Sequence, residues 1–133
     1  MNIHFTKMQA LGNDFVLLDL RRQKITLTPE LIQHLSHRRL GIGFDQCIVI
    51  TALNKASVTL KLYNANGCEV GQCGNGLRAA AYYLQTIEKT LPQQFDLIVQ
   101  EKAYAVEQSQ ALPRVNLGFP IWEPMQIPAD YEN

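Results

Sequence analysis

The stretch 64–78 constrains the fold more than any other part of this chain, because it connects a strand to a helix through a tight turn. Residues 58–63 alternate apolar and polar side chains, which is the period of a half-buried strand. Asn66-Gly67 is a strong turn signal, since both residues tolerate positive φ. The residues after Gly76 are strong or neutral helix formers, so we predict that a helix begins at residues 73–75.

This helix carries almost no charge. Its apolar residues recur at i, i+3, i+4 and i+7, and no charged residue lies between Arg78 and Glu88. A helix that is apolar on most sides is expected to be buried. We therefore predict an α+β fold, in which a mixed or antiparallel sheet curls around this central buried helix and one further helix is peripheral. Pro92 ends the central helix after Leu91.

Local signals predict the remaining elements. Thr28 and Pro29 indicate the start of the peripheral helix and Gly41 indicates its end. The basic residues 37–39 would lie in its last turn, where positive charge suits the negative end of the helix dipole. The predicted strands cover residues 3–6, 15–19, 47–51, 58–63, 95–100, 104–108 and 114–117. The last three are expected to form an antiparallel meander.

Two polar stretches separate some of these elements. Residues 11–14 lie between two predicted strands and are typical of a turn. Residues 41–46 contain two glycines but lack the third glycine and the following helix of a dinucleotide-binding motif. Asp45 and Gln46 could be turn residues or could place an amide in a site. From spacing alone, the turn is the better interpretation.

Cys73 is the strongest candidate for a reactive residue. Backbone N–H groups in the first turn of a helix have no helical partner, and the helix dipole adds positive charge there. Both effects favour a thiolate. Cys47 begins an apolar run and is interpreted as a small buried hydrophobe. The three cysteines include no Cys-x-x-Cys pair and the three histidines are scattered, so we expect neither a zinc site nor a disulfide framework.

Composition excludes several classes of function. Twelve basic residues balance twelve acidic ones, which argues against nucleic acid or an anionic membrane as the partner. No signal segment or membrane-spanning stretch is visible, so we expect a soluble, cytoplasmic protein. Prolines recur every fourth residue beyond Gly118, a spacing that we expect to forbid a helix and a central strand. We predict one domain over residues 1–118 and a proline-rich extended linker or arm over residues 119–133.

Three motifs, taken together, resemble the diaminopimelate epimerase family. They are Lys7-Met8-x-x-Leu11-Gly12-Asn13-Asp14-Phe15, Gly41-Ile42-Gly43-Phe44-Asp45-Gln46, and Asn64-x-Asn66-Gly67-Cys68 with Cys73-Gly74-Asn75-Gly76-x-Arg78. They occur in the family's order, and the likeness extends over almost the whole chain. Two positions differ within the third motif, because the family usually has Asp where Asn66 stands and Ser where Cys68 stands.

The resemblance implies a cofactor-independent isomerase that converts LL- to meso-diaminopimelate, a precursor of lysine and peptidoglycan, without pyridoxal phosphate or a metal. Inversion at an α-carbon needs a base on one face and an acid on the other, and the family uses a cysteine for each. Cys73 matches one of these two. The residues that match the family's substrate-binding positions are Asn13, Gln46, Asn64, Gly74 and Asn75. Backbone N–H groups of the last two would bind the α-carboxylate.

The family's enzymes consist of two similar halves, each of which contributes one cysteine to the cleft between them. This chain resembles the N-terminal half only, so the expected partners are the substrate and the C-terminal half of the same enzyme. We expect the chain alone to bind substrate weakly without epimerising it at a useful rate. Two alternatives stay open: a related cofactor-independent isomerase or racemase, and a non-catalytic binding module that forms a homodimer.

Overall fold

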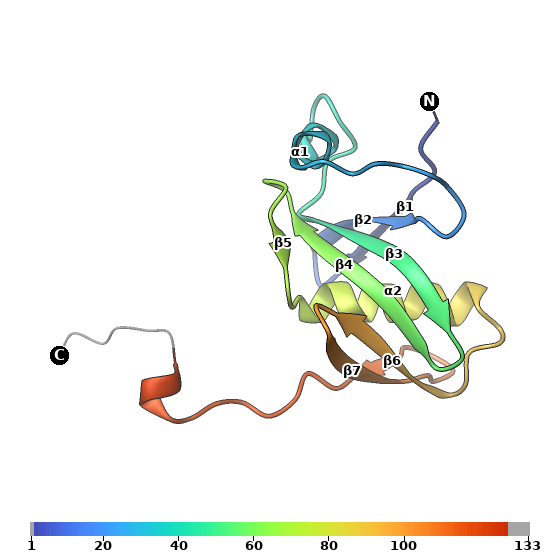
Figure 1. The fold of residues 1–133 in the computed structure, drawn as a ribbon, viewed down its shortest axis with the longest axis vertical. Coiled ribbons are helices and arrows are strands. Elements are labelled where there is room, and N and C mark those ends of the chain that lie inside the picture. The colour runs from blue at the N-terminus through green and yellow to red at the C-terminus, as the bar shows by residue number, and fades with distance from the viewer. Residues whose placement is uncertain (1, 128–133) are drawn as a thin grey trace.

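The computed structural model describes residues 2–127, which form an α+β fold (Figure 1). Its strands are β1 (Thr6–Ala10), β2 (Asn13–Asp19), β3 (Gln46–Asn54), β4 (Ser57–Asn64), β5 (Glu69–Val70), β6 (Gln94–Val99), β7 (Lys102–Glu107) and β8 (Arg114–Val115). Its helices are α1 (Pro29–Ser36), α2 (Gly74–Ile87) and the 3₁₀ turn η1 (Pro124–Gln126). The predicted combination of a sheet with two α-helices is therefore confirmed for the described residues.

The strands form one mixed sheet that curls into a half-barrel (Figure 1). The order across the sheet is β1-β2-β3-β4-β6-β7-β8, and β5 pairs with β4. Two neighbouring pairs are parallel, β2 with β3 and β4 with β6, and the others are antiparallel. Parallel neighbours need a crossover connection, and α1 and α2 lie in these two connections. The predicted antiparallel meander is confirmed as β6-β7-β8.

Strand β2 is buried on both faces of the sheet, because alternate residues of a strand point to opposite sides and both sets are apolar here. In β2, Phe15 and Leu17 belong to the core cluster that includes α2, whereas Val16 and Leu18 belong to the cluster that includes Ile32 of α1. All of these side chains are at most 1% exposed. The two faces explain why β2 reads as a continuous apolar run rather than as an alternating one.

Helix α2 packs one side against the sheet. Its buried residues are Gly76, Leu77, Ala79, Ala80, Ala81 and Leu84. Tyr82, on the other side, is 44% exposed. The prediction of a central helix buried on most sides is therefore not confirmed for residues 2–127. The helix also ends earlier than predicted, at Ile87, since Glu88 has already left the helical conformation as the C-cap.

The predicted position of the first strand is wrong. The strand covers Thr6–Ala10 rather than residues 3–6, and it pairs with β2 through a tight hairpin. Leu11 and Gly12 form the connection with φ values of 54° and 84°, the conformation typical of a two-residue hairpin turn. Such a turn aligns the residues next to it, so Ala10 pairs with Asn13 and Met8 pairs with Phe15.

The end of the first helix is also misplaced in the prediction. Helix α1 begins with Thr28 as its N-cap, as expected, but it ends at Ser36. His37 is already extended, with a ψ of 118°. Arg38 therefore does not complement a helix end. Its side chain instead reaches two carboxylates at the candidate site.

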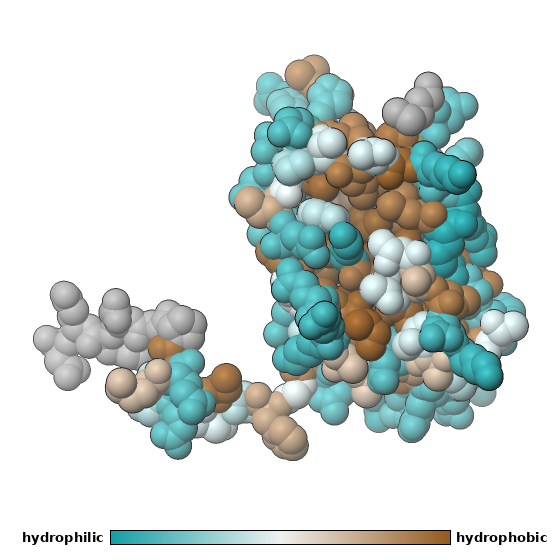
Figure 2. Space-filling model, in the orientation of Figure 1, coloured by the Kyte–Doolittle hydropathy of each residue, from teal (hydrophilic) through white to brown (hydrophobic). Residues whose placement is uncertain are grey.

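Residues 119–127 run away from the sheet (Figure 1). Figure 2 shows apolar side chains on this segment, apart from the main body. Phe119 and Met125 are each 98% exposed. The expectation that its prolines forbid any helix is too strong, because Pro124 begins the 3₁₀ turn η1 at a position where no N–H is required. Residues 128–133 of the predicted arm lie outside the described residues, and the division at residue 118 stays a prediction.

None of the helices formed by the described residues is long and apolar enough to cross a membrane.

Candidate active site

Cys73 is the N-cap of α2, as the sequence predicts. Its backbone is extended, with φ −150°, and its carbonyl accepts the first helical hydrogen bond from Leu77 N at 2.8 Å. The N–H of Gly76 donates to Cys73 Sγ at 3.3 Å. A Cβ at Gly76 would lie only 3.2 Å from that sulfur, so glycine permits the close approach. The thiol therefore takes the capping position that a Ser or Thr hydroxyl usually occupies.

An amide from β3 contacts this thiol, and a second amide from β4 orients the first. Gln46 is the first residue of β3 and Asn64 is the last residue of β4, and they are directly opposite in the ladder. Gln46 Nε2 donates to Asn64 Oδ1 at 3.1 Å, which orients the glutamine amide. The thiol of Cys73 then donates to Gln46 Oε1 at 3.0 Å.

Asn13 contributes a third amide from the start of β2. Its Oδ1 lies 3.9 Å from Cys73 Sγ, in the direction of the thiol. Gly74 and Asn75 follow Cys73 in the first turn of α2, where helical geometry provides no acceptor for their N–H groups. The structure therefore brings Asn13, Gln46 and Asn64 next to Cys73 and places Gly74 and Asn75 beside it. The roles that the resemblance assigns to these six residues stay predictions.

The turn between β4 and β5 contains both departures from the family motif. Asn66 Oδ1 accepts from Cys68 N at 3.0 Å, a bond that an aspartate oxygen could accept equally well. Gly67 has φ +84°, and a Cβ there would lie 2.6 Å from the carbonyl oxygen of Pro29. Gln33 Nε2 in α1 donates to Asn66 O at 2.7 Å. The turn after Asn64 therefore packs against α1 and is hydrogen-bonded to it.

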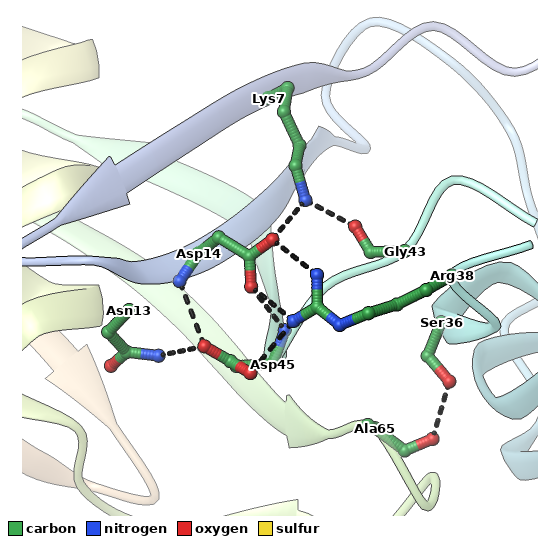
Figure 3. Close-up of polar contacts among 8 residues, drawn as sticks. All are labelled: Lys7, Asn13, Asp14, Ser36, Arg38, Gly43, Asp45 and Ala65. Atoms are coloured by element: carbon green, nitrogen blue, oxygen red, sulfur yellow. Dashed lines mark hydrogen bonds and ion pairs between the residues drawn. The ribbon is translucent and has the colours of Figure 1, made fainter.

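Four charged side chains, Lys7, Asp14, Arg38 and Asp45, meet next to Asn13, and we call them the charged cluster (Figure 3). Arg38 donates to both carboxylate oxygens of Asp14, at 2.8 and 3.0 Å, and to Asp45 Oδ1 at 3.0 Å. Lys7 donates to Asp14 Oδ2 at 2.8 Å and to the carbonyl of Gly43. Asp45 Oδ2 accepts from Asn13 Nδ2 at 3.0 Å. The cluster thus connects directly to the candidate site.

The charges of this cluster perturb one another. Hydrogen bonds from Arg38 and, to a smaller extent, Lys7 hold the pKa of the Asp14 carboxyl well below its usual range, although partial burial alone would raise it. Asp14 in turn raises the pKa of Arg38. Both groups therefore stay charged over the physiological range of pH.

Sequence reasoning missed this cluster. Asp45 was expected to be a turn residue and Arg38 to complement a helix dipole, because each has a sufficient local explanation. The informative signal is their position, since Asp45 lies within the second family motif and Arg38 lies shortly before it, separated from Gly41 by Arg39 and Leu40. Only the parallel pairing of β2 with β3 brings Asp14 and Asp45 together.

The three thiols differ in their surroundings, and all are free. Cys47 is buried against the cluster that includes α1, as expected, and burial raises its pKa to about 12. Cys68 is exposed and Cys73 is partly buried. Among residues 2–127, no group of three or more His, Cys, Asp and Glu side chains is arranged to hold a metal ion.

A cavity of about 690 Å³ lies between β1, α2 and the loop before β8. Leu11, Tyr82 and Leu112 line it together with Arg78, whereas Cys73 does not. The candidate site is a surface formed by the strand ends and the N-terminus of α2, and it borders this cavity through Lys7 and Asp14 of the charged cluster, which are among the lining residues.

Comparisons with solved structures support the fold. A phenazine biosynthesis PhzC/PhzF protein from Clostridium difficile matches 84% of this chain and 41% of its own with a TM-score of 0.58 and 19% identity. A methylitaconate-delta-isomerase matches 91% of this chain and 66% of its own with a TM-score of 0.57 and 14% identity. At these identities the likeness concerns the fold alone.

Sequence comparisons identify the family. The family model described as diaminopimelate epimerase matches residues 5–110. Proteins named diaminopimelate epimerase from Acinetobacter baylyi, a Psychrobacter species and Coxiella burnetii are 41%, 39% and 37% identical to it, each over 96% of this chain. The same alignments cover 47%, 45% and 48% of these relatives, so the chain spans about half their length. Because the family model matches residues 5–110, most of the chain, the chain belongs to the diaminopimelate epimerase family.

Proposed function

We propose that this chain forms one half of a diaminopimelate epimerase and supplies one of its two proton-transferring thiols. The observation that carries the proposal is the convergence of Asn13, Gln46 and Cys73, from three separate elements, at the N-terminus of α2. A thiol that is held between amides at a helix N-terminus has the surroundings that a cysteine acid or base requires.

The chemistry follows from the polarity of the site. A thiolate of Cys73 would remove the α-proton of the substrate, or its thiol would return one, on a single face of the carbon. The N–H groups of Gly74 and Asn75 would bind the α-carboxylate, on which negative charge grows as the carbanion forms. Gln46 and Asn13 would hold polar groups of the substrate beside the sulfur.

A second thiol is needed on the opposite face. Among residues 2–127, Cys73 is the one cysteine that contacts Asn13 or Gln46, while Cys47 is buried elsewhere. We infer that the partner is the other half of the enzyme, the C-terminal half in the family's order. That half would also cover the apolar surface near Tyr82, which would make α2 the central buried helix. As an enzyme of amino-acid biosynthesis, the complete protein is expected in the cytoplasm.

The test is a steady-state assay of the 133-residue chain with LL-diaminopimelate, together with substrate titration followed by amide NMR. We expect chemical-shift changes at Gly74 and Asn75 and no turnover at an ordinary enzymatic rate. Cys73→Ser should alter the titration, whereas the matched variant Cys68→Ser should not. If the substrate binds without chemical-shift changes at Asn13, Gln46 and the start of α2, the assignment of the site is contradicted. Ordinary turnover would contradict the need for a second half.

Two further measurements separate the remaining alternatives. A panel of other amino and hydroxy acids should bind more weakly than diaminopimelate if the family's substrate applies. Sedimentation at several concentrations determines whether the chain forms a homodimer. A dimer that epimerises diaminopimelate would show that two copies of Cys73 can serve opposite faces.

A further inference from the structure

The charged cluster connects the first residues of β2 and β3, the two strands that begin with Asn13 and Gln46. Asp14 follows Asn13 in β2, and Asp45 precedes Gln46 in β3. Each aspartate accepts the other's backbone N–H: Asp14 N donates to Asp45 Oδ2 at 3.0 Å, and Asp45 N donates to Asp14 Oδ1 at 2.9 Å. The two site amides are therefore attached to neighbours that bind each other reciprocally.

This arrangement brings two carboxylates close together, which like charges oppose. Arg38 lies between them and donates to both, with two parallel bonds to Asp14 and one to Asp45. Of these two carboxylates, Lys7 contacts only that of Asp14. The planar guanidinium can satisfy both carboxylates at once, whereas an ammonium provides a single point of charge.

The position of Asp45 decides how the amide of Asn13 is turned. Asp45 Oδ2 accepts from Asn13 Nδ2, and a carboxylate cannot accept from the amide oxygen. Asn13 Oδ1 is consequently the atom that faces Cys73 Sγ, at 3.9 Å. Figure 3 shows this path from Arg38 through Asp45 to Asn13.

We propose that Arg38 is a positioning residue of the site: it holds Asp14 and Asp45 together and, through Asp45, fixes the Asn13 amide with its oxygen toward Cys73. The proposal rests on the proposed function only in treating Asn13 as a substrate ligand. The geometry itself can be tested without substrate, so a failure here is distinguishable from a failure of the epimerase assignment.

The chain contains its own controls for the test. Cys68 is exposed and serves as the reference for reagent, and buried Cys47 reports any loss of fold. Arg39, the next residue, forms no ion pair within residues 2–127. We would compare R38A, R38K and R39A by two measurements: the side-chain amide resonances of Asn13, and iodoacetamide labelling of each cysteine followed by mass spectrometry.

In R38A, the Asn13 Nδ2 proton resonances should shift, because Asp45 is no longer held beside them. Labelling of Cys73 relative to Cys68 should rise by about threefold, because the Asn13 oxygen is no longer held toward the sulfur. This factor lies within the range of free energies measured for exposed ion pairs. R38K should be intermediate and R39A should match the unmodified chain, with Cys47 unlabelled throughout.

Unchanged Asn13 resonances and Cys73 labelling in R38A would overturn the proposal, as would an equal effect of R39A. If Cys47 becomes labelled in R38A, that variant has lost its fold, and the result for R38K then decides between the two outcomes. Shifted Asn13 resonances in R38K with Cys47 protected would support the proposal, and unshifted ones would overturn it.

Discussion

The thiol of Cys73 lies 3.0 Å from Gln46 Oε1, although 27 residues separate the two in the chain. On its other side the sulfur accepts from the N–H of Gly76. Gln46 Oε1 accepts from the thiol and Gly76 N donates to the sulfur, so these two contacts together fix the position of Sγ at the start of α2.

Gln46→Glu should slow alkylation of Cys73. The substitution places a carboxylate at about the same distance from the sulfur, and its charge opposes negative charge on the attacking sulfur. We expect the labelling rate to fall by about tenfold, the effect of a like charge placed beside the reacting atom. The measurement is the rate of iodoacetamide labelling of Cys73 relative to Cys68. Gln33→Glu, on α1, should leave that ratio unchanged, and an unchanged ratio in Gln46→Glu would contradict the contact.

Cys47 should resist labelling as long as the chain is folded. It is fully buried, and its pKa of about 12 leaves almost no thiolate near neutral pH. Labelling of Cys47 should therefore increase along the urea unfolding transition, in parallel with circular dichroism. Labelling of Cys68 should depend little on urea. Rapid labelling of Cys47 in native buffer would contradict its burial.

Most of the sheet could be predicted from the sequence, and so could the proximity of Cys73 to Asn13 and Gln46, whereas the roles of the site residues stay predictions. The strand over residues 58–63 and the thiol at the start of α2 follow from local periodicity and helix-start signals, which the structure retains. The family motifs then named Asn13 and Gln46, residues that spacing alone had assigned to turns.

The errors concern features that depend on distant parts of the chain. Pairing with β2 selects Thr6–Ala10 as the first strand, and β5 exists only as a two-residue partner of β4. Arg38 has a local explanation as a helix-end residue that competes with its actual contacts to Asp14 and Asp45. Local patterns in one sequence do not show whether Arg38 lies at a helix end or forms ion pairs with residues that are distant in the chain.

Gly67→Ala should destabilise the chain more than Gly12→Ala. Both glycines have φ +84°, so each substitution incurs the left-handed penalty of about 1–2 kcal/mol. A Cβ at Gly12 meets nothing within 4 Å, whereas at Gly67 it would lie 2.6 Å from Pro29 O and 2.7 Å from Pro29 Cα. Urea unfolding of both variants measures the difference. Equal losses would show that the turn can move away from α1 at no cost.

Leu77→Ala should lower the free energy of unfolding by about 2–5 kcal/mol, the range for a buried leucine. Leu77 is fully buried in the cluster that joins α2 to the sheet. The matched variant is Leu112→Ala, because Leu112 is 58% exposed and its truncation should cost less than about 1 kcal/mol. Urea or thermal unfolding gives both values. A similar loss in the two variants would contradict the packing of α2 on the sheet.

Asp14→Asn should destabilise the folded chain at neutral pH, and this destabilisation should disappear in acid. In the folded chain the pKa of Asp14 lies well below its ordinary value of 3.8, chiefly because Arg38 donates hydrogen bonds to the carboxylate. A carboxyl group whose pKa is lowered by folding stabilises the folded chain at pH values above the unfolded pKa. This contribution is lost as the pH falls through 3.8 toward the folded pKa. The difference in unfolding free energy between the unmodified chain and the variant should thus be constant from about pH 5 to pH 8 and should shrink below about pH 4. Urea unfolding at several pH values measures it, with Asp96→Asn as the control, because Asp96 forms no ion pair among residues 2–127. A difference that grows on acidification would reverse the sign and contradict the ion pair with Arg38.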